Sequence, residues 1–512
     1  MRVVSVAEMR EIEQRAEDQY GLTSPVLMEH AGRSIAEALR EHFGGDVTGR
    51  EILVLVGPGN NGGDGRVMGR YLADWGAHVT HYVWKGRRLE VDARYIPVSD
   101  DLAGVRGALA RADAVADALL GTGHTRPLDP TMGTLLSLVR EEKQRRSDLF
   151  ILAVDVPSGL NCDTGAIDDG TIEADMTVTL AFPKTGQFLF PGATYTGTLR
   201  VGAIGLPAGM EIAPGLELLD DALIRPLLPR RPLNSNKGTF GKVMILAGSP
   251  PYPGSAYLVA AAAARVGAGL VTLATVPALV PLYMTRLPEI TYHQLPEMSA
   301  SPEERAHALL EGLNGYRAVV IGPGLGHDEH ARAMLEHVFA GVRTMDESQR
   351  PRLIVDADGL NSLAQIDHWW ELLPPETIIT PHPMEMTRLR GGTAVSGGGA
   401  DRLEVTARAA RDWNLVVVLK GAFTLVASSD GRMRINGKGN PALASAGTGD
   451  VLAGAVGGLL AQNVAPFDAA AVAVYLHSEA GSRVSARIGD AGLLAGDLLP
   501  ELPMAIRAIK QS

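Results

Sequence analysis

Short apolar runs alternate with stretches of helical periodicity along most of the chain. In the first half these runs lie at 52–56 (ILVLV), 77–84, 151–156 and 176–182. In the second half they lie at 242–248, 269–275, 318–324, 352–359, 377–383 and 415–421. Runs of this length between helical segments are typical of strands buried on both faces of a parallel sheet. The pattern therefore predicts an α/β protein.

A helix is expected near the start of the chain. Ser5 and Glu8 have the spacing of a capping box, in which the two residues cap each other's backbone N–H groups. The apolar positions that follow have helical spacing; they are Val6, Met9, Ile12, Ala16 and Tyr20.

The apolar rhythm is interrupted at 207–234, where Pro, Gly and Asn are concentrated. Such composition is typical of a domain boundary. At about 150 residues per domain, 512 residues are too many for one ordinary core. We therefore expect two domains, residues 1–220 and residues 221–512.

Composition and charge narrow the class of protein. An apolar fraction of 46 % with 59 glycines suits a compact α/β protein rather than a disordered one. The net charge of −11, without a basic run, argues against a nucleic-acid partner. No stretch reaches the roughly 20 apolar residues that span a bilayer, so we expect no membrane partner. A single cysteine, Cys162, excludes an internal disulfide and fits a cytoplasmic protein; we expect its thiol to be inert.

A glycine-rich turn follows the first predicted strand. In GPGNNGGDG (57–65), Gly57, Gly59 and Gly62 have the G-x-G-x-x-G spacing of a dinucleotide fingerprint. An ordinary nicotinamide dehydrogenase would carry an acid at the end of the next strand, which here ends in Trp84 and Lys85. Arg87 and Arg88 could instead accept a 2′-phosphate, and a tight turn without a ligand is a further alternative.

Two other segments are expected at the same sheet edge. DALLGTGHTRP (117–127) ends an apolar run with a flexible loop, and VDVPSGLN (154–161) delivers Asp155 and Ser158 at a strand end. Asn61, Asp117 and Ser158 offer hard oxygen ligands with little charge, which indicates a monovalent cation. The alternative is that Asp117 and Asp155 merely cap helices.

MEHAG (28–32), GNNGGDG, DALLGTG and VDVPSGLN together resemble the NAD(P)H-hydrate epimerase family, the YjeF N-terminal domain, over about residues 1–215. The resemblance implies a Rossmann-like three-layer sheet whose substrate is a nicotinamide hydrated at C6. It implies potassium at Asn61, Asp117 and Ser158. Asp155 is the first acid/base candidate, and Asp117 or Lys184 could assist. The implied hydrate-binding residues are Asn60, Asn61, Gly62, Gly63, Asp64, Gly121, Thr122, Gly123, His124, Thr125, Arg126, Pro127 and Asp155.

The second half carries a different phosphate-binding pattern. SAGTGDVLAG (445–454) predicts a glycine turn opening into a helix, whose free N–H groups attract anions, yet Asp450 stands in it. The chain contains no GK[ST] phosphate loop. The segment resembles the anion-hole motif of ribokinase-like enzymes, in which the acid takes a proton from the attacking hydroxyl and glycine N–H groups stabilise the phosphoryl group. A simple helix cap is the alternative for Asp450.

Further motifs over 236–512 resemble the NAD(P)H-hydrate dehydratase domain; they are GKVMILAGS, GAGLVTLAT, GPGLG, VDADGLN, TPHPMEM, VLKGAFTLVA and AGLLAGDLLPELP. The resemblance implies a ribokinase-like fold with magnesium and ADP. The implied hydrate contacts are Ala268, Gly324, His382 and Asp450. The implied nucleotide contacts are Lys420, Gly421, Ala422, Phe423, Thr424 and Gly449. The chain departs from the family pattern at Met384, where glycine is usual, and at Asn236, where His is common.

Some of these residues also have structural interpretations. His382 lies in Pro-His-Pro and could serve only the turn, and Lys420 closes a buried strand, from which its ammonium could extend to solvent.

The leading hypothesis is a bifunctional repair enzyme. The first domain would interconvert the R and S hydrates of NADH and NADPH (NADHX and NADPHX), and the second would dehydrate the S form using ADP. One alternative is a ribokinase-like kinase of a vitamin-type alcohol; another is a first domain that only senses a dinucleotide. The family suggests a homo-oligomer.

Overall fold

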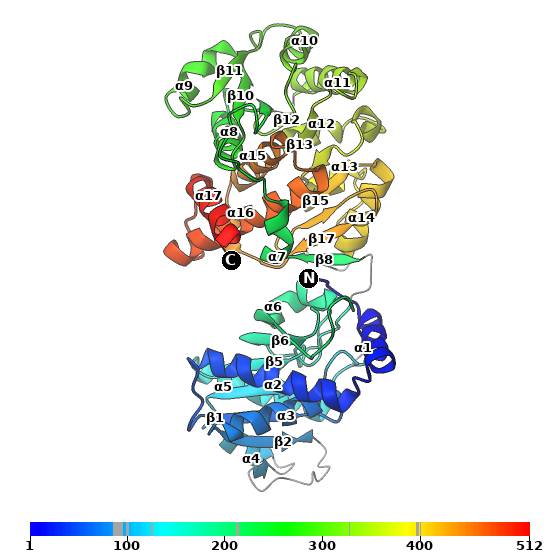
Figure 1. Cartoon of the computed structure of the whole chain (residues 1–512), viewed down its shortest axis with the longest axis vertical. Helices are drawn as coiled ribbons and strands as arrows, with labels where there is room; N and C mark the ends of the chain where they lie inside the picture. Colours follow the sequence, from blue (N-terminus) through cyan, green and yellow to red (C-terminus); the bar gives the residue numbers. More distant parts are fainter. Residues whose placement is uncertain are drawn as a thin grey trace. The chain divides into compact units, whose positions relative to one another are not determined.

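The computed structural model describes residues 1–84, 96–98, 102–123, 126–210, 215–326, 328–395, 399 and 401–511. The chain forms two compact units (Figure 1). One comprises Arg2–Gly215; the other runs from Leu216 to the C-terminal helix and also includes Met1. The change of unit lies inside the Pro- and Gly-rich stretch at 207–234. None of the described helices is both long enough and apolar enough to span a membrane.

The N-terminal unit is built on a seven-stranded sheet in the order β3-β2-β1-β4-β5-β6-β7, with every neighbouring pair parallel. Its strands are β1 (Glu51–Val56), β2 (His78–Val83), β3 (Ile96–Val98), β4 (Ala114–Ala118), β5 (Phe150–Val154), β6 (Met176–Leu180) and β7 (Thr198–Gly202). Its helices are α1 (Val6–Tyr20), α2 (Ser24–His42), α3 (Asn60–Asp74), α4 (Leu102–Leu109), α5 (Pro130–Arg145) and α6 (Gly192–Thr196), with a 3₁₀ turn at Thr185–Phe188.

Two apolar cores lie on the two faces of this sheet. Alternate residues of β1 divide between them: Ile52, Val54 and Val56 pack with α1, α2 and α3, whereas Leu53 and Leu55 pack with α4 and α5. This confirms the predicted three-layer, Rossmann-like α/β arrangement. The strand order reverses between β1 and β4, and ligands of open α/β sheets bind at the carboxyl ends of strands at such a reversal.

The C-terminal unit has a ten-stranded sheet in the order β11-β10-β9-β12-β13-β14-β15-β16-β17-β8. The strands are β8 (Leu216–Leu219), β9 (Lys242–Leu246), β10 (Leu270–Thr275), β11 (Thr291–Gln294), β12 (Ala318–Ile321), β13 (Arg352–Val355), β14 (Ile378–Ile379), β15 (Val416–Leu419), β16 (Leu425–Ala427) and β17 (Met433–Asn436). The first seven strands in this order, from β11 through β10 and β9 to β15, are parallel to one another. Strand β16 is antiparallel to both of its neighbours.

Helices cover this second sheet. They are α7 (Asp221–Ile224), α8 (Pro253–Arg265), α9 (Val280–Met284), α10 (Pro302–Gly312), α11 (Glu329–Thr344), α12 (Asp358–Leu363), α13 (Pro383–Leu389), α14 (Asp401–Trp413), α15 (Thr448–Ala461), α16 (Pro466–Ile488) and α17 (Ala495–Gln511), with 3₁₀ turns at Arg225–Leu227, Pro277–Leu279, Trp369–Leu372 and Pro441–Leu443. Helices α8, α15, α16 and α17 share one apolar core. A Cβ on Gly454 would lie 2.2 Å from the carbonyl oxygen of Val259, so glycine permits the close packing of α15 on α8.

Two candidate active sites

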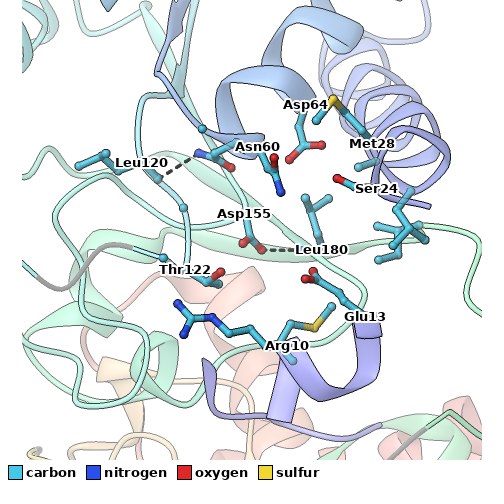
Figure 2. A pocket seen from close by; sticks show the side chains of 18 of the residues that line it. Arg10, Glu13, Ser24, Met28, Asn60, Asp64, Leu120, Thr122, Asp155 and Leu180 are labelled. Carbon is cyan, nitrogen blue, oxygen red and sulfur yellow. Dashed lines mark hydrogen bonds between the residues drawn. The ribbon is translucent and has the colours of Figure 1, made fainter. Parts of the chain in front are cut away.

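A cavity of about 710 Å³ lies in the N-terminal unit at the reversal between β1 and β4 (Figure 2). Its lining includes the turn after β1, the turn after β4, Asp155 after β5, and one face of α1. The turns approach closely, because a Cβ on Gly57 would lie 1.7 Å from the carbonyl oxygen of Leu119. Helix α3 begins at Asn60 without a side-chain cap. Its free N–H groups therefore suit an anion in the cavity.

Asp155 forms a buried ion pair beside this cavity. Its φ of +66° turns the chain sharply after β5. Its Oδ1 accepts hydrogen bonds from Lys184 Nζ and from the backbone N–H of Leu180, at 2.9 Å from the latter. The Lys184 side chain is 1 % exposed and also donates to Thr179 Oγ1 at 3.1 Å and to the Leu180 carbonyl at 2.9 Å. The structure thus places a carboxylate and an ammonium together in a region closed to bulk water.

Two further acids face the same space. Figure 2 shows Asp64 from α3, Glu13 from α1 and Asp155 pointing toward one another. Burial raises the pKa of Asp64 to about 8, and the charges of Asp155 and Glu13 add to the rise. Burial likewise raises the pKa of Glu13, against the effect of Lys184. Asp64 therefore carries a proton at neutral pH, which makes it a hydrogen-bond donor toward the cavity.

Glu13 was not expected from the sequence. The residues Arg10, Glu13, Gln14 and Glu17 all line the cavity and share one face of α1 at helical spacing. A polar stripe at that spacing, opposite the buried Met9, Ile12 and Ala16, was the available signal.

Asn61, Asp117 and Ser158, the three residues expected to hold a cation, lie together beside the turn after β4. Ser158 donates to Asp117 through its backbone N–H at 2.8 Å and through its hydroxyl at 2.6 Å. The Ser158 oxygen accepts from the backbone N–H of Leu120 at 2.9 Å, and Asn61 Nδ2 donates to the Leu120 carbonyl at 3.0 Å. Burial raises the pKa of Asp117, and the hydrogen bonds from Ser158 and Leu119 lower it.

The remaining expected residues of this unit are distributed as follows. Asn60, Asn61, Asp64, Gly121, Thr122, Gly123 and Asp155 line the cavity, as does Lys184. Gly62 and Gly63 are buried inside α3, where a Cβ on Gly63 would lie 2.4 Å from the Met28 side chain. Arg126 and Pro127 are exposed and are not among the lining residues. His124, Thr125, Lys85, Arg87 and Arg88 lie outside the described residues. Burial raises the pKa of Cys162 to about 12, so its thiol stays protonated at neutral pH.

A second cluster of charges lies at the carboxyl ends of β13, β14 and β15 in the C-terminal unit. Lys420, directly after β15, donates to Asp356 Oδ1 at 2.7 Å and lies 3.7 Å from Glu385 Oε2. Asp356, directly after β13, also accepts from Thr380 Oγ1 at 2.7 Å. Burial raises the pKa of Glu385 to about 7, against the effect of Lys420. Burial opposes charging of Lys420, but Asp356 and Glu385 reverse that effect and raise the Lys420 pKa.

Asp450 lies in the first turn of α15, next to this cluster. The helix starts after Gly447, whose φ is +85°, a conformation that glycine adopts without strain. A Cβ on Gly449 would lie 3.4 Å from Lys420 Nζ. Burial raises the pKa of Asp450 to about 6, Asp356 adds to the rise, and a hydrogen bond with Ser255 lowers it. Asp450 can therefore take up a proton near neutral pH at a helix N-terminus that attracts anions.

His382 has a local structural role in addition to its place near Lys420. Its ring Nδ1 accepts from the backbone N–H groups of Met384 and Glu385 at 3.1 and 3.3 Å. The backbone N–H of His382 donates to Glu385 Oε2 at 2.8 Å. These contacts cap α13 and leave the proton of the neutral ring on Nε2. Burial lowers the pKa of His382, and Lys420 lowers it further. Met384 is exposed directly after this cap.

The segment from Lys420 to Thr424 forms a turn that a buried arginine holds in place. Gly421 has a φ of +143° and Phe423 a φ of +55°. Arg402, from α14, donates to the carbonyls of Ala422 and Lys420 at 3.1 and 3.3 Å. Neither Arg402 nor Glu385 was named as a site residue from the sequence: Arg402 lies outside the quoted motifs, and Glu385 lies in TPHPMEM but reaches Lys420 of a different motif.

Ala268 is not brought to this cluster. It precedes β10, and so lies at the amino edge of the parallel strands, whereas Asp356 and Lys420 follow the carboxyl ends of theirs. The glycines around it have a packing role: a Cβ on Gly269 would lie 1.8 Å from the carbonyl oxygen of Lys237. Ser255 and Gly324 occupy the carboxyl edge instead. Ser255 hydrogen-bonds Asp450, and a Cβ on Gly324 would lie 2.8 Å from the Cβ of Ser255.

Two family models match the chain. One, described as YjeF-related protein N-terminus, matches residues 24–186. The other, described as NAD(P)H-hydrate dehydratase, matches residues 243–504. The first match includes Asp64, Asp155 and Lys184 but not Glu13, and the second includes Asp356, Lys420 and Asp450.

Curated relatives match over nearly their whole length. A bifunctional NAD(P)H-hydrate repair enzyme of Moorella thermoacetica is 37 % identical over 530 aligned positions, which cover 100 % of this chain and 98 % of the relative. The enzyme of the same description from Escherichia coli (strain K12) is 34 % identical and covers 97 % of this chain and 92 % of the relative.

Solved structures match the C-terminal unit. A ribokinase-like superfamily protein from Enterococcus faecalis V583 is 28 % identical, with a TM-score of 0.50, over 58 % of this chain and 97 % of that chain. The ADP/ATP-dependent NAD(P)H-hydrate dehydratase from Bacillus subtilis, co-crystallised with ATP and Mg²⁺, is 31 % identical over 58 % of this chain and 100 % of that chain, with a TM-score of 0.49.

Proposed function

The chain belongs to the family of bifunctional NAD(P)H-hydrate repair enzymes, and from this membership we propose which residues carry its two activities. The activities are NAD(P)H-hydrate epimerisation and ADP/ATP-dependent NAD(P)H-hydrate dehydration. We assign the first to the unit Arg2–Gly215 and the second to the unit that begins at Leu216. The observation that carries the assignment is that each unit has its own buried cluster of carboxylates and one lysine at the carboxyl ends of its own strands.

The epimerase site is the cavity between β1 and β4. The N-terminus of α3 would hold the dinucleotide's pyrophosphate, which leaves the hydrated ring to face Asp64, Asp155 and Glu13. Inversion at C6 needs one group that accepts a proton and one that donates it. The ion pair with Lys184 suits Asp155 to accept, and the proton held by Asp64 at neutral pH suits that residue to donate.

Potassium fits the site formed by Asn61, Asp117 and Ser158. Asp117 is 1 % exposed, and its hydrogen bonds among the described residues come from neutral donors, the Ser158 amide and hydroxyl and the Leu119 amide. A buried carboxylate without a cationic partner is costly. A monovalent cation held by these side-chain oxygens would supply the missing charge and fix the turn after β4.

The dehydratase site is the cluster at the carboxyl ends of β13 to β15. Asp450 would take the proton of the C6 hydroxyl as that oxygen attacks the terminal phosphorus of the nucleotide. The free N–H groups at the start of α15 would stabilise the charge on the transferred phosphoryl group. Departure of phosphate from C6, with loss of a proton from C5, then restores the dihydropyridine. His382 and Gly324 would contact the hydrate.

The nucleotide would bind along Lys420–Thr424 and Gly449, in the turn that Arg402 holds. The Bacillus subtilis dehydratase is described as ADP/ATP-dependent, which leaves both nucleotides open. We propose ADP as the donor in this chain, because the fusion of the epimerase and dehydratase domains favours ADP. Magnesium spreads the charge of a phosphoryl group in transfer. The described residues contain no group of three or more His, Cys, Asp or Glu side chains arranged for a metal. Mg²⁺ would therefore be held mainly by the phosphates and water, as is usual for this ion.

We also propose that the protein works in the cytoplasm as a homo-oligomer. The single buried Cys162 suits a reducing compartment. The oligomer rests on family resemblance alone.

The test is repair of a mixture of both NADH-hydrate epimers by the full-length protein with magnesium and either ADP or ATP. Absorbance of the reduced nicotinamide reports the product. Full recovery of NADH with ADP is expected, and faster recovery with ATP would overturn the choice of donor. Recovery limited to the S share would contradict epimerisation and favour a first domain that only senses a dinucleotide. A stable phosphorylated alcohol with no recovery would favour the small-molecule kinase.

A further inference from the structure

A second large cavity lies in the C-terminal unit, at the edge of the sheet opposite Asp450. Its volume is about 630 Å³. Most of its lining residues lie just before or at the start of strands β12, β13 and β14. The others lie in the connection between α15 and α16. Because β12 to β14 are parallel, these residues lie at amino ends, whereas Asp356 and Lys420 follow carboxyl ends. The cavity therefore shares no residue with the dehydratase site.

The cavity is rich in arginine on a chain whose net charge is −11. Arg317, Arg350 and Arg352 line it, with Glu376 as the carboxylate among the lining residues. Glu376 Oε2 lies 2.9 Å from Arg352 Nη1. Asp346 acts electrostatically on Arg350 from just outside the lining, and Glu347 lines a smaller cavity next to this one. Arg317 is left without a carboxylate among the contacts of the described residues.

The contacts of Arg317 and Arg350 go to backbone carbonyls. Arg317 Nη1 donates to the carbonyl of Ala461 at 3.3 Å, at the end of α15. Arg350 Nη2 donates to the carbonyls of Arg343 and Met345 at 3.0 and 2.7 Å, at the end of α11. These contacts have a structural use, because they cap two helix C-termini. They occupy one nitrogen of each guanidinium, and the buried Nε of Arg350 has no hydrogen-bond partner among the described residues.

The opposite side of the cavity adds positive potential and apolar surface. Helix α16 starts there at Pro466, after Ala465, without a side-chain cap. The backbone N–H groups of Phe467 and Asp468 in this first turn have no partner within the helix, and the Asp468 carboxylate beside them is paired with Arg434. Leu460, Val464 and Tyr316 add apolar surface to the lining.

We propose that this cavity binds a small organic phosphate, at a site separate from both active sites. Arginine guanidinium groups pair with phosphate oxygens in a forked geometry. The volume lies in the range of about 300–1,000 Å³ that suits a small organic ligand and exceeds the needs of a free phosphate ion. The apolar surface of the lining would contact the organic part, and Arg317, Arg350 and the start of α16 would bind the phosphate.

The test is calorimetric titration of the full-length protein with ribose 5-phosphate and, separately, with inorganic phosphate. We expect ribose 5-phosphate to bind more tightly than inorganic phosphate. In the double variant Arg317→Gln/Arg350→Gln, which removes both arginines that would bind the phosphate, the affinity should fall by about tenfold or more, the scale of a lost charged hydrogen bond. Arg408→Gln, which removes an exposed arginine of α14, is the matched control. Dehydratase turnover should stay unchanged in both variants.

A second measurement locates the bound phosphate without mutation. Amide hydrogen exchange should slow in 314–317 and 460–468 when ribose 5-phosphate is added. Protection confined to 445–452, equal affinity in the double variant and its control, or no binding by the wild-type protein would each overturn the proposal. Tighter binding of inorganic phosphate would overturn the organic part of the assignment.

Discussion

Burial displaces the pKa of carboxyl groups at both sites toward neutral pH. It raises that of Asp450 to about 6, that of Glu385 to about 7 and that of Asp64 to about 8. Each group lies near another carboxylate and near a lysine, which act in opposite directions on it. Acid/base catalysis is most efficient when the pKa of the group lies close to the working pH. Both sites thus hold carboxyl groups whose pKa lies near neutral pH, although their sheets differ in strand order.

Dehydration should depend on the charge of Asp450. A base works in its ionised form, so the rate should rise with pH and level off above about 6, the pKa set by burial and Asp356. Below that value the rate should fall about tenfold per pH unit. Above about pH 6, Asp450→Asn should reduce turnover by about 10²- to 10⁴-fold and leave nucleotide affinity intact, and the difference from the wild type should shrink as pH falls below that value.

The measurement is the pH profile of NADH formation from the pure S hydrate. Asp412→Asn, which removes an exposed acid of α14 in the same unit, should keep the wild-type profile. A profile without the step near pH 6 would contradict the role of Asp450 as base.

Asp64→Asn should affect epimerisation and stability in opposite directions. The amide cannot transfer a proton, so epimerisation should fall by about 10²- to 10⁴-fold while hydrate binding persists. The raised pKa means that the folded state binds more protons than the unfolded state between about pH 4 and 8. Stability therefore falls as pH rises through that window, and the cost is complete above it. The variant lacks this cost and should be the more stable protein at pH 9.

Chromatography of the R and S forms and urea unfolding at pH 5 and 9 would measure the two effects. Asp148→Asn, at an exposed acid of the same unit, is the control. A variant that is less stable than the wild type at pH 9 would contradict the pKa assignment.

At the scale of elements, the cap of α1 connects local structure with the cavity proposed for epimerisation. Ser5 Oγ accepts from the Glu8 N–H at 3.2 Å, and Glu8 Oε2 accepts from the Ser5 N–H at 2.7 Å. The same helix carries Arg10 and Glu13 into the cavity. Fraying of its first turn should therefore disturb substrate binding as well as stability.

Ser5→Ala should destabilise the N-terminal unit by about 1 kcal/mol, the usual worth of such a cap. It should also raise the KM for epimerisation and leave dehydration unchanged. Ser301→Ala removes an equivalent capping box from α10 in the other unit and is the matched control. Equal effects of the two variants on epimerisation would contradict the link between the α1 cap and the cavity.

The apolar pattern predicted most of the buried parallel strands, and it missed the buried β4, whose sequence is mostly alanine, and the exposed edge strands. Strand β1 is buried along nearly its whole length, so its sequence is one apolar run. Strand β7 lies at a sheet edge with most of its residues exposed, and β8 and β11 are edge strands of the second sheet. An edge strand forms because it hydrogen-bonds to its neighbour, not because both of its faces are buried. Its sequence therefore contains no apolar run from which the strand could be predicted.

The candidate sites show the same division. Asp155 and Asp356 stand directly after apolar runs, so the sequence could indicate that they lie at strand ends. Glu13 and Arg402 lie outside the quoted motifs, and Glu385 lies in TPHPMEM but contacts Lys420, which is distant in sequence. At Ala268, the family resemblance implied a hydrate contact, whereas the residue precedes β10, at the edge of the sheet opposite Asp356 and Lys420.

At the scale of the whole molecule, each proposed site draws its residues from one unit. The lining of the first cavity lies entirely within Arg2–Gly215, and the cluster around Lys420 lies entirely within the unit that begins at Leu216. Neither site needs a side chain from the other unit. The two activities should therefore be separable by single substitutions, although one chain carries both.

Mixing two inactivated proteins tests this independence. With both epimers of NADH hydrate, ADP and magnesium, Asp155→Asn should stop at the S share, because the dehydratase is intact and the epimerase is not. Asp450→Asn should form no NADH and should still equilibrate R with S. An equimolar mixture of the two variants should recover all the NADH, because the hydrate released by one protein can reach the other through solution. Absorbance of the reduced nicotinamide follows recovery, and a reaction with Asp155→Asn alone measures spontaneous epimerisation. A mixture that stops at the S share would mean that one of the sites depends on residues of the other unit in the same chain.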